Sequence, residues 1–164
     1  MGRAYLLTIF ALCLVLRGPA AAALEQKTPE TLEKEIAKES NARRRANLAR
    51  DLLTQRLQLL RARIATGNML EESSPELATY DAALGMFGNA VKEAAHPGTS
   101  KSAEQFLRDQ IHDLDNFKMN VSAAERPYLD RIVTRAGALR GELLDGLMHP
   151  QPKQESQRQD QVSK

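Results

Sequence analysis

A stripe of apolar residues between positions 77 and 94 constrains the fold of this chain more than any other feature of its sequence. The stripe recurs at alternating intervals of three and four, through Leu77, Tyr80, Leu84, Phe87, Val91 and Ala94. This spacing places the side chains along one narrow face of an α-helix. Because a face this narrow must be covered by other helices, the stripe predicts a helical bundle.

The composition favours the same fold class. The chain has 164 residues, which is enough for one domain with appendages. Aromatic residues make up only 4% and tryptophan is absent, so the core must consist mainly of Leu, Ala, Ile and Val. Such a core suits interdigitating helices better than a sheet, which favours β-branched and aromatic residues.

Residues 1–23 are typical of a secretory signal peptide. Arg3 precedes an uncharged apolar run at 4–16, and small residues then offer cleavage after Ala22 or Ala23. The run is shorter than the ~20 residues that span a bilayer. We therefore expect an exported protein, periplasmic or extracellular after cleavage, with an uncleaved membrane anchor as the alternative.

Removal of this segment changes the chemistry of the chain. The only cysteine, Cys13, lies within it, so the exported protein has no thiol for a disulfide, a metal site or a nucleophile. Arg3 and Arg17 are also lost without any acid, which leaves 21 basic residues against 21 acidic ones. This balance gives no indication of a nucleic-acid partner.

Periodic apolar residues and capping signals predict five helices in an antiparallel bundle. We expect four main helices and a short first one packed alongside, at about 28–38, 41–66, 74–94, 102–119 and 122–147. The bundle domain is then 24–150. The polar segment 151–164 contains a single apolar residue, Val162, and is predicted to be disordered because it cannot bury enough surface to become ordered.

Local signals place the helix ends. Thr28 before Pro29 and Ser74 before Pro75 are typical of helix starts, whereas His96-Pro97-Gly98 is interpreted as the end of the third helix. Two capping boxes are expected to open the last two helices, Ser102 with Gln105 and Ser122 with Glu125. Gly85 and Gly88 lie beside the apolar stripe, where we expect another backbone to approach closely.

Residues able to carry catalysis or to bind a metal are few. The sequence holds three histidines, His96, His112 and His149, and no nucleophile turn, phosphate loop or dinucleotide fingerprint. Asp109 and His112 lie one helical turn apart, but a di-metal bundle requires such a pair twice. We therefore expect no enzyme, no metal site and no cofactor; haem held non-covalently by one His and one Met is not excluded.

The second helix carries the most unusual charge in the chain. Seven arginines stand there against one acid, Asp51: Arg43, Arg44, Arg45, Arg50, Arg56, Arg61 and Arg63. Arginine favours bidentate contact with carboxylate or phosphate, so this helix is a candidate surface for an anionic partner. The flanking segments 24–40 and 67–93 are acidic and together balance its charge, and we favour internal pairing as the explanation.

Part of the chain resembles a group of secreted all-helical bacterial proteins of unknown function. The resemblance covers about 31–150 and is carried by Leu48, Ala49, Leu52, Arg56, Leu57, Gly67, Leu77, Tyr80, Ala83 and Leu84. It implies a helical extracytoplasmic fold and no catalytic or binding residue. The periplasmic helical chaperones are another possible relative, but their Leu-Thr-x-x-Gln signature is not matched at Leu53-Thr54-Gln55.

These patterns favour binding over catalysis. Our leading hypothesis is an envelope interaction or scaffold module that binds another protein through helix faces or the basic helix, with self-association as a further option. The alternative is a binder of anionic lipid, polymer or other ligand through the arginines of the second helix. Contact with a membrane surface belongs to this alternative.

Overall fold

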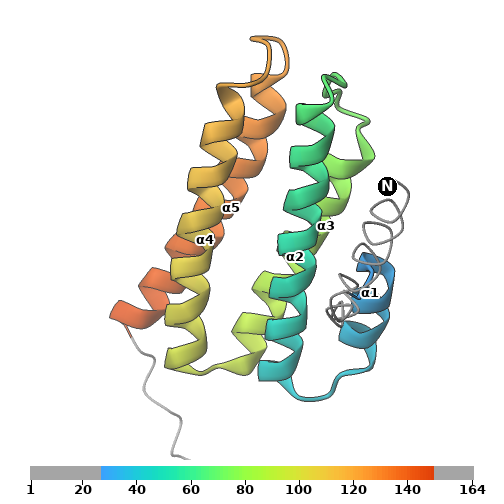
Figure 1. Ribbon diagram of the computed structural model, residues 1–164. Helices are drawn as coiled ribbons and strands as arrows, with labels where there is room; N and C mark the ends of the chain where they lie inside the picture. The colour runs from blue at the N-terminus through green and yellow to red at the C-terminus, as the bar shows by residue number, and fades with distance from the viewer. Residues whose placement is uncertain (1–26, 150–164) are drawn as a thin grey trace, which may run out of the picture.

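The computed structural model describes residues 27–149, which fold into five α-helices without a strand (Figure 1). The helices are α1 (Pro29–Lys38), α2 (Ala42–Ala65), α3 (Pro75–Ala94), α4 (Pro97–Lys118) and α5 (Arg126–Met148). The predicted all-α bundle is confirmed. The expected signal peptide at 1–23 and the tail at 151–164 lie outside the described residues. No helix within 27–149 combines the length and the apolar character needed to cross a membrane.

The bundle consists of two antiparallel hairpins that pack against each other. One hairpin is α2 with α3, the other is α4 with α5, and α1 lies on the outer side of α2 (Figure 1). Ion pairs between α5 and the α3 side of the first hairpin advance in the same direction along both segments: Glu72 with Arg131, Asp81 with Arg135 and Lys92 with Glu142. Helices that face each other across the two hairpins are therefore parallel, although successive helices are antiparallel.

The predicted apolar stripe of α3 lies at the centre of the core. Tyr80, Leu84, Phe87 and Val91 are almost completely buried, and Ala94 is half-buried at the end of the stripe. The Phe87 ring meets the Phe106 ring of α4 edge to face, with 5.4 Å between the centroids. Leu59 of α2 lies outside the core, since its side chain is 45% exposed.

The buried stripe contains one polar group. The Tyr80 hydroxyl donates a hydrogen bond to Oε1 of the buried Gln110 at 3.3 Å, which links α3 to α4. Burial raises the pKa of Tyr80 above its ordinary value, so the hydroxyl stays protonated and keeps its role as donor.

The first three helices each begin after a residue that commonly caps a helix. The Thr28 hydroxyl accepts a hydrogen bond from the Thr31 N–H, and Asn41 Oδ1 accepts one from the Arg44 N–H. The start of α3 after Ser74 is also as predicted. These confirmed starts share a residue of good capping chemistry before the first turn.

The start of α4 was predicted wrongly. The helix begins at Pro97, five residues before the expected Ser102, and the connection from α3 is only Ala95 and His96. Ala95 adopts a left-handed backbone with φ of 43°, which ends α3 abruptly. The proposed capping box of Ser102 with Gln105 therefore lies inside the helix and caps nothing.

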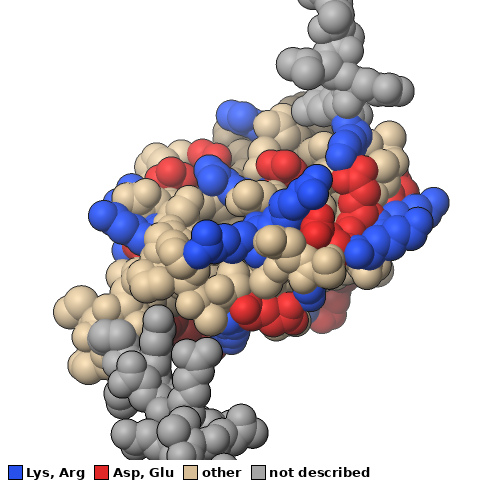
Figure 2. Space-filling model, turned by 90° about the horizontal axis from the view of Figure 1, so that it is seen from below, with Lys and Arg blue, Asp and Glu red and all other residues tan. Residues whose placement is uncertain are grey.

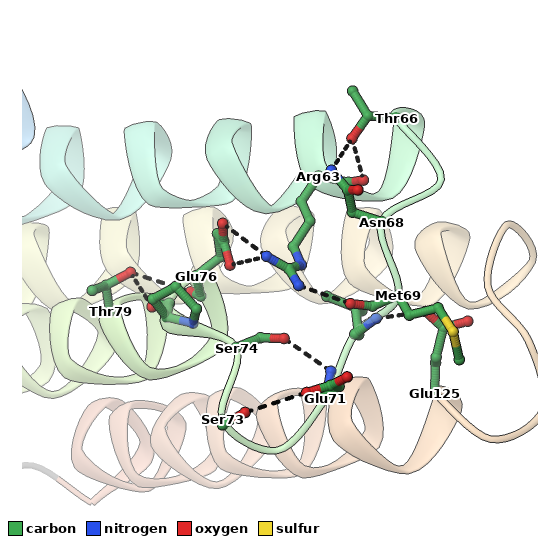
Figure 3. A network of polar contacts seen from close by, with 12 residues as sticks. Arg63, Thr66, Asn68, Met69, Glu71, Ser73, Ser74, Glu76, Thr79 and Glu125 are labelled. Carbon is green, nitrogen blue, oxygen red and sulfur yellow. Dashed lines mark hydrogen bonds and ion pairs between the residues drawn. The ribbon is translucent and has the colours of Figure 1, made fainter.

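The start of α5 shows a polar clasp between the two hairpins (Figure 3). The helix begins at Arg126 rather than at Ser122, and Glu125 is its N-cap residue. One carboxylate oxygen of Glu125 accepts the Ser122 N–H at 2.9 Å, as the capping box predicts. The other oxygen accepts the Leu70 N–H at 2.7 Å, from the loop between α2 and α3. This second bond fastens the loops of the two hairpins together.

Close packing at the glycines of α3 involves side chains, not the backbone that we expected. A Cβ atom at Gly88 would lie 2.9 Å from Cδ1 of Leu139 in α5. At Gly85 the nearest atom is the Arg135 guanidinium nitrogen, at an ordinary contact distance of 3.5 Å. Only Gly88 is therefore held by tight packing.

Replacement of Glu125 tests the clasp. Glu125→Gln should lower the free energy of unfolding by about 1–3 kcal/mol, because an amide cannot accept both N–H groups as strongly as a carboxylate. Urea unfolding measures the change. Glu72→Gln is the control, since its ion pair with Arg131 is exposed and should contribute less than about 1 kcal/mol. Equal effects of the two substitutions would argue against the clasp.

The same clasp should respond to acid. Hydrogen bonds from the Ser122 side chain and from the Leu70 and Ser122 N–H groups lower the pKa of Glu125 below its ordinary value of 4.5. Its contribution is therefore present above pH 4.5 and is lost as the pH falls through the lowered pKa. The stability difference between the wild type and Glu125→Gln should shrink over that acidic range.

Alanine substitutions separate the two glycines. Gly85→Ala should raise the free energy of unfolding by about 0.5–1 kcal/mol, because it improves helix propensity without a clash. Gly88→Ala gains the same propensity but pushes against Leu139, so it should be less stable than Gly85→Ala. Thermal or urea unfolding of the two variants measures the difference, and equal gains would show that Leu139 yields freely.

Candidate anion-binding site

Four of the seven arginines of α2 are used in internal ion pairs. Their partners come from the two acidic flanking segments, as the charge balance predicts: Arg44 pairs with Glu39, Arg45 with Glu93, Arg56 with Glu33 and Arg63 with Glu76. These arginines fasten α1 and α3 to α2. They are poor candidates for an external anion, because binding one would require breaking an existing contact.

Arg63 illustrates this internal use (Figure 3). Its guanidinium donates to both carboxylate oxygens of Glu76, at 3.1 and 3.3 Å, and to the Met69 carbonyl at 2.9 Å. The side chain thus ties the end of α2 to the start of α3 and to the loop between them. Nη1 makes both contacts to Glu76 and Nη2 the contact to the Met69 carbonyl, so these charge-assisted hydrogen bonds have a structural role.

The other three arginines lie on the face of α2 that is turned toward α4. Arg43, Arg50 and Arg61 follow each other at intervals of seven and eleven, which keeps them on one side of the helix. None of the three forms an ion pair with a carboxylate of residues 27–149. They were part of the predicted basic surface, but the sequence could not distinguish them from the paired four.

Two of these arginines stack on aromatic rings of α4. The Arg50 guanidinium carbon lies 4.8 Å from the centroid of Phe106, and that of Arg61 lies 5.8 Å from the centroid of Phe117. The residue numbers in both pairs differ by 56, because α2 and α4 run in parallel. A cation–π contact holds a guanidinium in place without neutralising its charge.

Arg43 and Arg50 line a cavity of about 280 Å³ where α2 and α4 begin. Its floor consists of buried apolar residues, and its rim carries exposed polar and cationic side chains. The lining residues are Arg43, Ala46, Asn47, Arg50, Phe87, Val91, His96, Gly98, Thr99, Ser102 and Ala103. No Asp or Glu is among them. This end of the molecule is seen in Figure 2, where basic side chains run across the surface with acidic ones interspersed.

The first turn of α4 forms one wall of the cavity. His96 is the N-cap residue, and its Nδ1 accepts the Gly98 N–H at 3.1 Å. The first turn carries no acid, unlike those of α1 and α3, so nothing there offsets the partial positive charge of the helix start. The hydroxyl-bearing residues Thr99 and Ser102 lie in the opening turns. Positive charge therefore converges on the cavity from two helices.

Sequence reasoning missed the α4 side of this site. The sequence predicts Thr99 in a loop, Ser102 as the cap of the fourth helix, and His96 at the end of the third helix. In the structure His96 is the N-cap residue of α4, and Ala95 is the C-cap residue of α3. A usable signal existed, because Pro97 follows His96 just as Pro29 follows Thr28 at a helix start.

A second cavity lies at the other end of the same seam between α2 and α4. Its volume is about 420 Å³, and Arg61, Asp113, Asn116 and Phe117 are among its lining residues. The carboxylate of Asp113 offsets the charge of Arg61 there. Of the two cavities on this seam, the one beside Arg43 has the stronger anion-binding chemistry.

The pair considered for metal binding is placed on the surface. Asp109 and His112 are both exposed on α4, and Asp109 lies 3.6 Å from the Arg108 guanidinium. No group of three or more His, Cys, Asp or Glu side chains within 27–149 is arranged to hold a metal ion.

Comparison with known proteins gives no functional lead. No family model, no curated protein and no solved structure matches the chain. Any assignment of function therefore rests on the geometry of the cavity and its charges.

Substitution of a paired arginine should destabilise the fold more than substitution of an unpaired one. Arg63→Gln should lower the free energy of unfolding by about 1–3 kcal/mol, because Glu76 and the Met69 carbonyl lose charged donors. Arg43→Gln should change it by less than about 0.5 kcal/mol, because this side chain is exposed and has no carboxylate partner within 27–149. Urea unfolding measures both variants. A large loss in Arg43→Gln would assign that residue a structural role.

Proposed function

We propose that the chain is a non-enzymatic, exported binding protein that holds an anionic ligand in the cavity between α2 and α4. One observation carries the proposal: Arg43 and Arg50 line a cavity that has no acidic residue and that also meets the start of α4. Guanidinium groups and helix starts are two groups that commonly bind phosphate or carboxylate.

The chemistry of the cavity supports binding rather than catalysis. His96 is the only histidine among the lining residues, and its Nδ1 already accepts the Gly98 N–H. A general acid–base pair needs a second group of suitable pKa within reach of the substrate. The lining residues supply none, because they include no Asp, Glu, Cys or Lys.

The scaffold hypothesis finds less support in the geometry. The apolar faces of α2 to α5 are turned into a shared core, which removes them as docking surfaces. The large apolar side chains left exposed are distributed over separate elements: Leu59, Met69, Met86, Met119 and Met148. Scattered exposed residues of this kind are normal and do not mark a partner.

Titration with inorganic phosphate tests the proposed function. In the exported form, residues 24–164, amide NMR signals of Asn47, Thr99 and Ser102 should shift together as phosphate is added. A double variant of Arg43→Gln and Arg50→Gln should weaken binding at least tenfold, since each lost charged hydrogen bond is worth about 1.5–3 kcal/mol.

Matched controls come from the same helix. Arg61→Gln removes an arginine that also stacks on a phenylalanine, and Arg44→Gln removes one that is already paired with Glu39. Both variants should bind phosphate like the wild type. If all of the variants lose affinity equally, the effect is one of net charge and the cavity is not the site.

A further inference from the structure

We propose that the ligand of this cavity is a small free organic anion, with one phosphate or carboxylate head attached to an apolar body. The inference rests on the proposed function and deepens it by assigning the chemical class of the ligand. It follows from the order in which polar and apolar groups are arranged between the mouth of the cavity and its floor.

The floor of the cavity is part of the hydrophobic core. Ala46, Phe87, Val91 and Ala103 are each less than 5% exposed. These residues offer no hydrogen bond to an inorganic anion, and they favour a ligand that brings apolar surface of its own.

The charged groups lie at the mouth. Arg43, Asn47 and Arg50 are exposed at the rim, and Thr99 in the first turn of α4 is half-buried beside them. An anionic head is therefore bound at the surface, with the attached body directed inward. Arg50 is positioned for this contact by its stacking on Phe106.

This arrangement favours a free molecule over a lipid in a membrane. A membrane presents its headgroups first and keeps the acyl chains in the bilayer, so a headgroup would enter the cavity and meet an apolar floor. The cavity has the opposite polarity, with the apolar part innermost. Its volume of about 280 Å³ is also just below the usual range for small-molecule sites, which suits only a compact ligand.

Isothermal titration of the exported form with three probes tests the inference. Inorganic phosphate supplies the head alone, benzyl alcohol an apolar body alone, and phenyl phosphate both. Phenyl phosphate should bind at least tenfold more tightly than either of the others. Equal affinities of phenyl phosphate and phosphate would overturn the inference and leave the proposed function standing, whereas the absence of binding by both would remove the proposed function as well.

Substitution of the floor gives an independent test. Ala103→Leu should fill the cavity and reduce the preference for phenyl phosphate over phosphate to less than threefold. Circular dichroism checks the fold, and Ser102→Leu, at an exposed position of the same wall, replaces this variant if it does not fold. Gln105→Leu is the control, because it adds the same side chain to an exposed position of α4 outside the cavity. An undiminished preference in the filled variants would overturn the inference.

Vesicles that contain phosphatidic acid complete the experiment, because they present a similar phosphate group from a membrane. The free ligand should bind without any retention of the protein on the vesicles. Retention that depends on Arg43 and Arg50, without affinity for phenyl phosphate, would contradict the inference and assign the site to a membrane surface.

Discussion

The burial of the apolar stripe on α3 is the interaction on which the rest of this structure depends. Leu84, Phe87 and Val91 cannot be covered by one neighbour, so the α4–α5 hairpin must pack against the α2–α3 hairpin. The edge contact between Phe87 and Phe106 lies at this interface. Phe87 and Val91 also form part of the floor of the cavity, which makes the candidate site an extension of the core.

The arginines of α2 have two different roles. The net charges of α2 and of its flanking segments do not distinguish between them. On the side toward α1 and α3, arginines form direct ion pairs with glutamates of the flanking segments, and these pairs neutralise their charge. On the side toward α4, Arg43, Arg50 and Arg61 meet aromatic and hydroxyl-bearing residues instead. A chain with nearly equal numbers of opposite charges, 23 basic and 21 acidic residues, can thus retain a concentrated positive region where two helices begin.

The sequence was sufficient for features that depend on neighbouring residues. The periodicity of α3, the cap at Thr28 and the pairing of Arg63 with an acid of the flanking segment all belong to this class. The start of α4 failed because a proline after a histidine can end one helix or begin the next, and here it does the latter. The cavity itself was out of reach, since it depends on residues 56 positions apart, such as Arg43 and Thr99, being aligned by the parallel packing of α2 and α4.

The two hairpins are joined covalently at one end only, through Ala95 and His96. The three Cα–Cα steps from Ala94 to Pro97 reach no more than about 11 Å, so this end cannot separate widely. The opposite end is joined across the hairpins by the bond from the Leu70 N–H to Glu125. An opening between the hairpins that breaks this bond must pivot about Ala95 and His96, with the largest displacement at the far loops. The cavity lies beside the pivot, where such breathing moves the chain least, and its geometry can therefore outlast a partial opening of the bundle.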